Sequence, residues 1–143
     1  MDGVSNPDRC DVDVLEDRIG RNIGSDNLIP YLMKHEFEAL LFSDVECLHE
    51  DSAVKKKLNG ILRRFNGAPE SINTDASPSC RLMEVFSNNG YRYSKTRMGL
   101  IVAKNIGIPR MREKCPHFDQ WVSRLESICE GSRQRLSSLE FTH

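Results

Sequence analysis

Residues 28–44 read LIPYLMKHEFEALLFSD, and this stretch says more about the fold than any other part of the chain. The apolar run Leu28–Met33 predicts a short strand, although Pro30 lacks a backbone N–H and so confines the strand to an edge or to a strand start. Apolar side chains beyond it share one helical face and predict a short helix over residues 36–42. Because a single strand needs a partner, we expect a second short strand or a second chain beside Leu28–Met33.

Helical periodicity dominates the rest of the chain. Apolar residues recur at helical spacing between capping residues and glycines, and they predict helices over residues 11–23, 52–66, 78–88, 94–106 and 116–130, with shorter turns at 43–48 and 108–115. Ser43, Ser52 and Ser77, the last followed by Pro78, are expected to cap the elements that begin there, and Gly131 is expected to end the last helix. We therefore expect a mostly α (α+β) fold of about six helices with one or two short strands. It would form a single α-rich domain over residues 11–130, between a flexible N-terminus at residues 1–10 and a flexible tail at residues 131–143.

The composition is that of an ordinary soluble globular protein. Of the 143 residues, 38% are hydrophobic and 29% are charged, which indicates a chain that folds rather than a chain that is disordered throughout. The longest apolar stretch is far shorter than the ~20 residues that span a bilayer, and acidic residues stand where a signal peptide would be basic and apolar. The 5 cysteines are odd in number and lack CxxC spacing. We therefore expect reduced thiols, no zinc site, no membrane partner and a cytoplasmic location.

Charge is distributed unevenly along the chain. Residues 1–51 carry 4 basic and 13 acidic side chains, whereas residues 92–114 carry 7 basic and 1 acidic. The acidic front and the basic middle can face each other across one domain, or they can present separate faces to a cation and to a polyanion. The sequence leaves both interpretations open.

The basic middle predicts a surface for DNA or RNA. Clustered lysines and arginines attract phosphates, and the candidate contacts are Arg81, Lys95, Arg97 and Arg112. Two tyrosines next to Lys95 could stack on unpaired bases. The alternative is a set of solvated helix faces, since the chain has no helix-turn-helix, zinc finger or other named nucleic-acid motif.

Acidic side chains beside the apolar run are the candidates for chemistry. Ionisable groups there are costly to bury unless they are paired or coordinated, so Glu36, Glu38 and Asp44 are candidate magnesium ligands, and the two glutamates are candidate catalytic residues. Glu36 and Glu38 point the same way only where the backbone is extended, whereas on a helix His35 would neighbour Glu38. The alternative is a polar helix start with acidic groups at its positive end. His117, at another expected helix start, is a candidate for catalysis or for capping and packing.

The stretch at residues 28–44 is similar to the central motif of the bacterial family catalogued as domain of unknown function 4276. In that motif an apolar Pro-Tyr segment leads into His-Glu-Phe-Glu-Ala and ends in Ser-Asp. Further pieces of the family's pattern follow in the same order, at Pro69–Asn73, Ser77–Leu82, Tyr93–Lys95, Ile106–Ile108 and Cys115–Phe118. The resemblance extends over residues 12–130, and the ordered set is more specific than any one piece.

The resemblance implies a function. Members of this family look like relatives of Toprim nucleases and are often encoded beside AAA-type ATPases, in what look like mobile-element or phage-defence loci. The resemblance therefore implies that the chain is a nucleic-acid-directed, magnesium-dependent, nuclease-like module. The family's strand-glycine-glutamate segment and its aspartate-ended strand should precede Leu28, but the 27 residues there read as one helix. The chain thus resembles the C-terminal two-thirds of a family member, with a weak or incomplete metal site. The alternative is a non-catalytic module that docks on an AAA-type ATPase or forms a homodimer.

Overall fold

The computed structural model describes residues 12–26, 28–33, 36–72 and 75–140, and in these residues it contains seven α-helices, three short helical turns and no β-strand. The chain divides into two compact units, Met1–Leu32 and Met33–His143, and each is described by itself. The prediction of a mostly helical protein is therefore confirmed, and the prediction of short strands is not.

The first unit contains helix α1 (Val12–Ile23), which was predicted from its apolar spacing. The predicted strand at Leu28–Met33 does not form, and the described residues contain no strand that could pair with it. Leu32 instead donates its backbone N–H to the carboxylate of Glu16 on α1, at 2.6 Å. A strand needs the hydrogen bonds of a neighbouring strand, and the proline in this apolar run also removes one N–H donor. The side chain of Glu16 satisfies part of its backbone instead.

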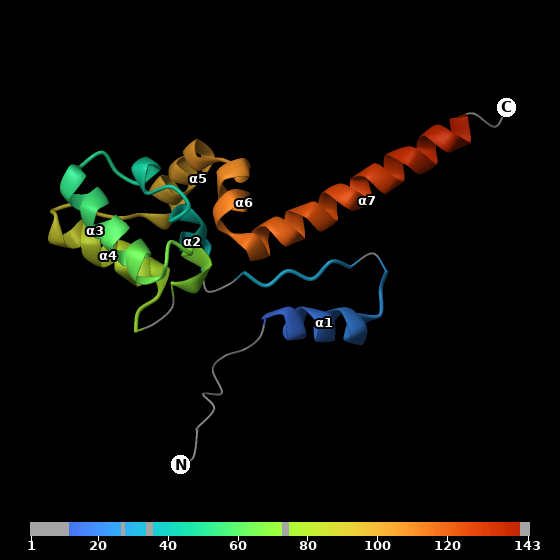
Figure 1. The fold of residues 1–143 in the computed structure, drawn as a ribbon, viewed down its shortest axis with the longest axis horizontal. Helices are drawn as coiled ribbons and strands as arrows, with labels where there is room; N and C mark the ends of the chain where they lie inside the picture. The colour runs from blue at the N-terminus through green and yellow to red at the C-terminus, as the bar shows by residue number, and fades with distance from the viewer. Residues whose placement is uncertain (1–11, 27, 34–35, 73–74, 141–143) are drawn as a thin grey trace, which may run out of the picture. The chain divides into compact units, whose positions relative to one another are not determined.

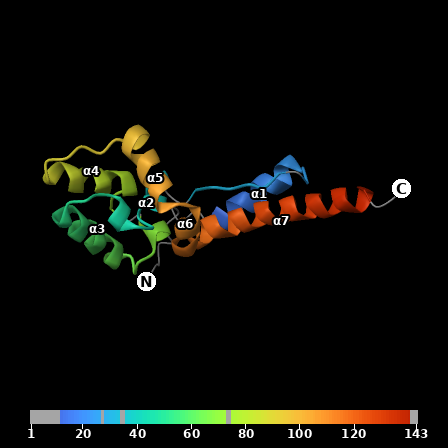
Figure 2. The ribbon, with the colours of Figure 1, turned by 90° about the horizontal axis from the view of Figure 1, so that it is seen from above.

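The second unit contains all the remaining elements (Figure 1). Its α-helices are α2 (Phe37–Leu41), α3 (Ser52–Arg64), α4 (Pro78–Asn88), α5 (Leu100–Ile106), α6 (Ile108–Lys114) and α7 (Pro116–Glu140). Two 3₁₀ turns, η1 (Val45–Cys47) and η2 (Pro69–Ser71), and one π-helical turn, η3 (Lys95–Gly99), lie between them. Helix α2 packs against α4, α5 and η2, and α3 packs against α4 (Figure 2).

The core of the second unit is built around α2. Ala39, Leu40, Leu41 and Phe42 at and after this helix are at most 5% exposed, although the helix has only five residues. So short a helix is unstable alone in water, and burial of its side chains against α4, α5 and η2 holds it in place. The predicted helix at residues 36–42 is confirmed.

Local capping decides where the middle helices begin. Ser77 accepts a hydrogen bond from the N–H of Cys80, and Pro78 occupies the first turn of α4, as the Ser-Pro pair predicted. At α3 the cap is Asp51, which accepts from the N–H of Ala53, rather than the expected Ser52. The short turn expected to begin at Ser43 is capped by Asp44 instead. In both cases the observed cap lies one residue from the expected one.

The last helix is longer than the sequence indicated. Helix α7 passes through Gly131 and reaches Glu140, so the expected stop at this glycine is wrong. A glycine inside a helix costs about 1 kcal/mol relative to alanine, which the helix-forming residues on both sides can outweigh. The expected flexible tail is helix over residues 131–140, whereas residues 141–143 and the expected flexible N-terminus at residues 1–10 lie outside the described residues. The expectation of one domain over residues 11–130 stays a prediction.

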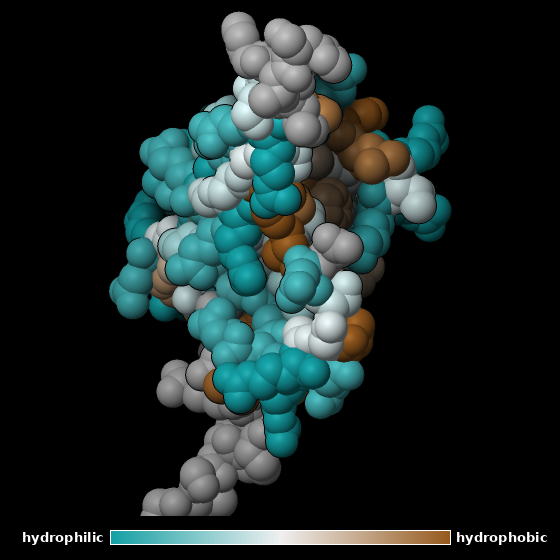
Figure 3. Space-filling model, turned by 90° about the vertical axis from the view of Figure 1, so that its right-hand side faces the viewer, coloured by the Kyte–Doolittle hydropathy of each residue, from teal (hydrophilic) through white to brown (hydrophobic). Residues whose placement is uncertain are grey.

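The surface is mixed in character. Hydrophilic side chains predominate on the face in Figure 3, with hydrophobic ones exposed among them. Leu100 and Ile101 of α5 are 67% and 61% exposed. Among the described helices, none combines the length and apolar character that crossing a bilayer requires.

Candidate functional site

Glu36 lies immediately before α2, where the backbone is extended with φ −147° and ψ 161°. Its Oε2 accepts the backbone N–H of Ser79 at 2.8 Å, in the first turn of α4. Partial burial raises the pKa of this carboxyl, but hydrogen bonds from Ser79 and Ser77 and the charge of Lys95 outweigh it, so the pKa is lowered. Glu36 is therefore an ionised group at the positive end of another helix.

Glu38 lies in the first turn of α2 and is fully buried. Its Oε1 accepts a hydrogen bond from the hydroxyl of Tyr93 at 3.2 Å. Its Oε2 lies 3.4 Å from Nζ of Lys95, yet accepts no hydrogen bond from any described residue. Burial raises the pKa of Tyr93, as do the charge of Glu38, the hydrogen bond to it and the charge of Glu36. A buried carboxylate oxygen without a hydrogen-bond partner is uncommon, and Glu38 is therefore a candidate functional residue.

We call Glu36, Glu38, Tyr93 and Lys95 the carboxylate cluster. Its members come from two sequence motifs, and Ser79 from a third one binds Glu36. The packing of α2 against α4 and α5 brings these segments together. Glu36 and Glu38 thus form hydrogen bonds and an ion pair with residues that lie far from them in the sequence.

The π-helical turn η3 presents Lys95 to this cluster. The N–H groups of Met98 and Gly99 both bond to the carbonyl of Ser94, which is the signature of the wider turn. A Cβ on Gly99 would lie 3.3 Å from both the Phe37 ring and the Tyr93 hydroxyl, so this position favours glycine. Such turns occur often at functional sites. The sequence indicated a helix here but carried no signal for its π geometry.

The four carboxylate oxygens of Glu36 and Glu38 are of the hard kind that a magnesium ion takes as ligands. One accepts an N–H, one accepts the tyrosine hydroxyl, and one lies beside the ammonium of Lys95. Among the described residues of the Met33–His143 unit, no three His, Cys, Asp or Glu side chains converge as metal ligands would. Three of these four oxygens therefore have a neighbour of their own within the protein.

The other acidic candidate, Asp44, is not part of the cluster. It caps η1 by accepting the N–H of Glu46 at 3.1 Å, and it lies 3.8 Å from Nε of Arg110. His35 lies outside the described residues.

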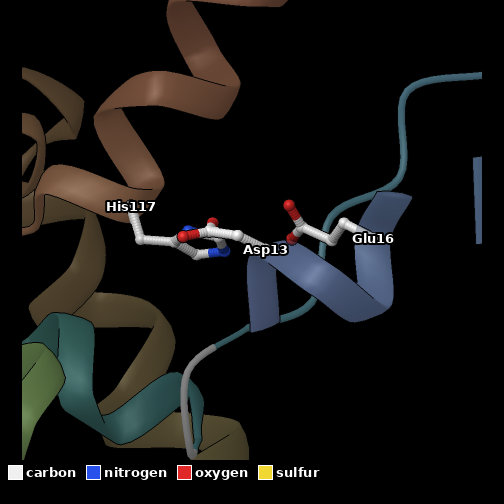
Figure 4. A group of neighbouring side chains, drawn as sticks. All are labelled: Asp13, Glu16 and His117. Carbon is white, nitrogen blue, oxygen red and sulfur yellow. The ribbon is translucent and has the colours of Figure 1, made fainter. Parts of the chain in front are cut away.

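His117 is the second residue of α7, and its N–H and that of Phe118 donate to the two carboxylate oxygens of Glu70, each at 3.0 Å. Glu70 carries no local signal for this role in the sequence, because its function as a cap depends on contacts between distant segments. Figure 4 shows the side chain of His117 with Asp13 and Glu16 of α1. Those two residues belong to the Met1–Leu32 unit, so we assign no common role to the three.

The predicted nucleic-acid contacts lie in different surroundings. Arg97 is exposed on η3, next to Lys95. Arg81 donates its Nε to the carbonyl of Ala76, and its guanidinium lies 5.2 Å from the centre of the Phe65 ring.

Arg112, by contrast, is engaged within the protein. Its guanidinium donates to Asp119, Ser123 and Glu126 of α7 and so holds α6 to α7. Of the two tyrosines proposed to stack on bases, Tyr93 stacks against Phe86 with ring centres 5.8 Å apart. The other, Tyr91, packs against His49 at 4.2 Å.

Comparison with known proteins gives one match. A family model described as "Domain of unknown function (DUF4276)" matches residues 2–126. No curated protein and no solved structure matches the chain. The match covers well over half of the 143 residues and agrees with the family that the ordered motifs indicated. The chain therefore belongs to the DUF4276 family.

Proposed function

We propose that this chain is a nucleic-acid-directed module of nuclease-like descent that binds the phosphodiester backbone beside the carboxylate cluster. The observation that carries the proposal is the environment of Lys95. Its ammonium lies 3.4 Å from the fully buried Glu38, while its side chain remains 62% exposed. A lysine anchored at one side and open to solvent at the other is placed to contact a phosphate.

Arg97 strengthens this proposal. It is exposed on the same π-helical turn as Lys95, so two cations project from one short, irregular segment. Glu38 acts here as a positioning residue, because it is buried and reaches Lys95 and Tyr93 within the protein. These residues support binding of a polyanion without, by themselves, supplying a route to its cleavage.

Cleavage by a magnesium-dependent route would require oxygen ligands beyond this cluster. Two divalent ions commonly activate water and stabilise the leaving oxygen in such reactions. We propose that the isolated chain binds magnesium weakly, with Glu38 and Glu36 as partial ligands, because most of their oxygens already have partners. Binding, not hydrolysis, is the activity proposed for the chain by itself.

The test is a fluorescence-anisotropy titration of single- and double-stranded oligonucleotides at several salt concentrations. Each neutralised phosphate contributes about −0.7 to −0.9 to the slope of log K against log salt. Replacing both Lys95 and Arg97 by alanine should flatten that slope by about one to two units. The matched control replaces Arg133 and Arg135, two exposed cations on α7, and should leave the slope unchanged.

Two results would contradict the proposal. The first is the absence of binding at low salt, where basic surfaces are most adhesive. The second is an equal effect of the two double substitutions, which would show that net charge alone determines binding.

A second candidate function is supported by the exposed apolar residues of α5. Leu100 and Ile101 are largely exposed, and Ile101 lines a groove of about 450 Å³ between η1 and α5, together with Leu48, Met98 and Val102. Exposed apolar side chains beside a groove favour docking of a protein partner. An AAA-type ATPase or a second copy of the chain would be that partner. The same titration separates the two functions, since a protein-docking module shows no salt-dependent binding of oligonucleotides.

A further inference from the structure

A second basic surface lies away from η3, in the groove between α3 and α4. This groove has a volume of about 400 Å³. It is lined by Lys57, Gly60, Ile61 and Arg64 of α3 and by Arg81, Glu84, Val85 and Asn88 of α4. Three cations thus face one acid in a concave space. The volume is that of a small-ligand pocket, which suits phosphate groups of a single strand better than the body of a duplex.

The spacing along α3 fits a row of phosphates. Lys57, Ile61 and Arg64 are separated by four and three residues and so lie on one face of the helix. Seven residues of helix correspond to about 10 Å, so the two cations at the ends of this row can contact separate phosphates of one strand.

The cations of the groove are placed for an external anion. Lys57 and Arg64 are exposed, and among the described residues neither one forms an ion pair. Arg81 is oriented by Phe65 below its guanidinium and by the carbonyl of Ala76. Arg81 also lies in the first turns of α4, where the helix dipole favours negative charge.

We propose that the groove between α3 and α4 binds the phosphate backbone of a single nucleic-acid strand, through Lys57, Arg64 and Arg81. This inference rests on the proposed nucleic-acid function and adds a binding surface to it. Ser79, which anchors Glu36, and Arg81 lie two residues apart on α4. The first two turns of α4 therefore contact the carboxylate cluster through Ser79 and line the groove through Arg81.

Two double substitutions on the same helix test the proposal. Lys57→Ala with Arg64→Ala removes two groove cations, whereas Lys56→Ala with Arg63→Ala removes two exposed cations that do not line the groove. Both pairs change the net charge equally, and alanine preserves the helix. The measurement is the affinity for two single-stranded oligonucleotides of equal length and different sequence, by fluorescence anisotropy at several salt concentrations.

The groove variant should bind both oligonucleotides about tenfold more weakly at low salt, with a slope reduced by about 1.4 units for two lost contacts at about 0.7 each. The control variant should change affinity by less than about threefold. If the two variants behave alike while the unmodified chain still binds, the groove proposal is wrong and the proposed function survives. If the unmodified chain binds neither oligonucleotide, both proposals are wrong.

Discussion

The ion pair between Glu38 and Lys95 offers a quantitative test of the candidate site. We consider a double-mutant cycle made of Glu38→Gln, Lys95→Met and the double variant. Glutamine keeps an oxygen that can accept the hydroxyl of Tyr93, so this change removes mainly the charge. Methionine keeps the apolar stem of the lysine. The coupling energy of the cycle then reports the interaction between the two charges.

The expected magnitude follows from the geometry. Unit charges at the observed 3.4 Å interact by about 1 kcal/mol in water and by about 5 kcal/mol at an effective dielectric constant of 20. The lysine side chain is 62% exposed, so the value for water is the better guide and solvent screening keeps the energy small. We expect a coupling of about 1 kcal/mol at low salt, decreasing at 1 M salt because the Debye length falls to about 3 Å.

Urea unfolding followed by tryptophan fluorescence measures this coupling, since the chain has 1 tryptophan, Trp121 on α7. Lys104→Met is the matched control, because Lys104 is an exposed cation of α5 that forms no ion pair with any described residue. Its coupling to Glu38→Gln should be zero. A coupling below about 0.3 kcal/mol between Glu38 and Lys95, within the usual error of additivity, would refute the view that Glu38 positions the lysine.

Two further predictions concern the metal and the start of α7. Isothermal titration should show weak manganese binding by the isolated chain, and an affinity tighter than about 10 µM that Glu38→Ala abolishes would show a complete site. Glu70→Ala leaves two N–H groups at the start of α7 without their acceptor and should lower the free energy of unfolding by about 1–3 kcal/mol. Urea unfolding measures this loss, with Glu130→Ala at an exposed position of α7 as the control; equal effects of the two changes would contradict the capping role.

The sequence by itself determined the helical elements wherever the signal is local. Ser77 followed by Pro78 predicted the start of α4, and apolar spacing predicted α1 and α3. Caps and helical periodicity act over a few residues, so the chain carries this information without its fold. The same local reasoning failed at Leu28–Met33, because a strand depends on a partner elsewhere, and at Gly131, because the preference of one glycine is weak.

Only the tertiary structure decided how the candidate site is assembled. The sequence singled out Glu36 and Glu38 because charges near an apolar segment require partners, and both do have partners. Those partners lie 43 residues away at Ser79 and 55 residues away at Tyr93. Their identity depends on how α2 packs against α4 and α5, which is a matter of long-range burial. Local propensity cannot encode such contacts, because the free energy that forms them comes from side chains that meet only in the folded core.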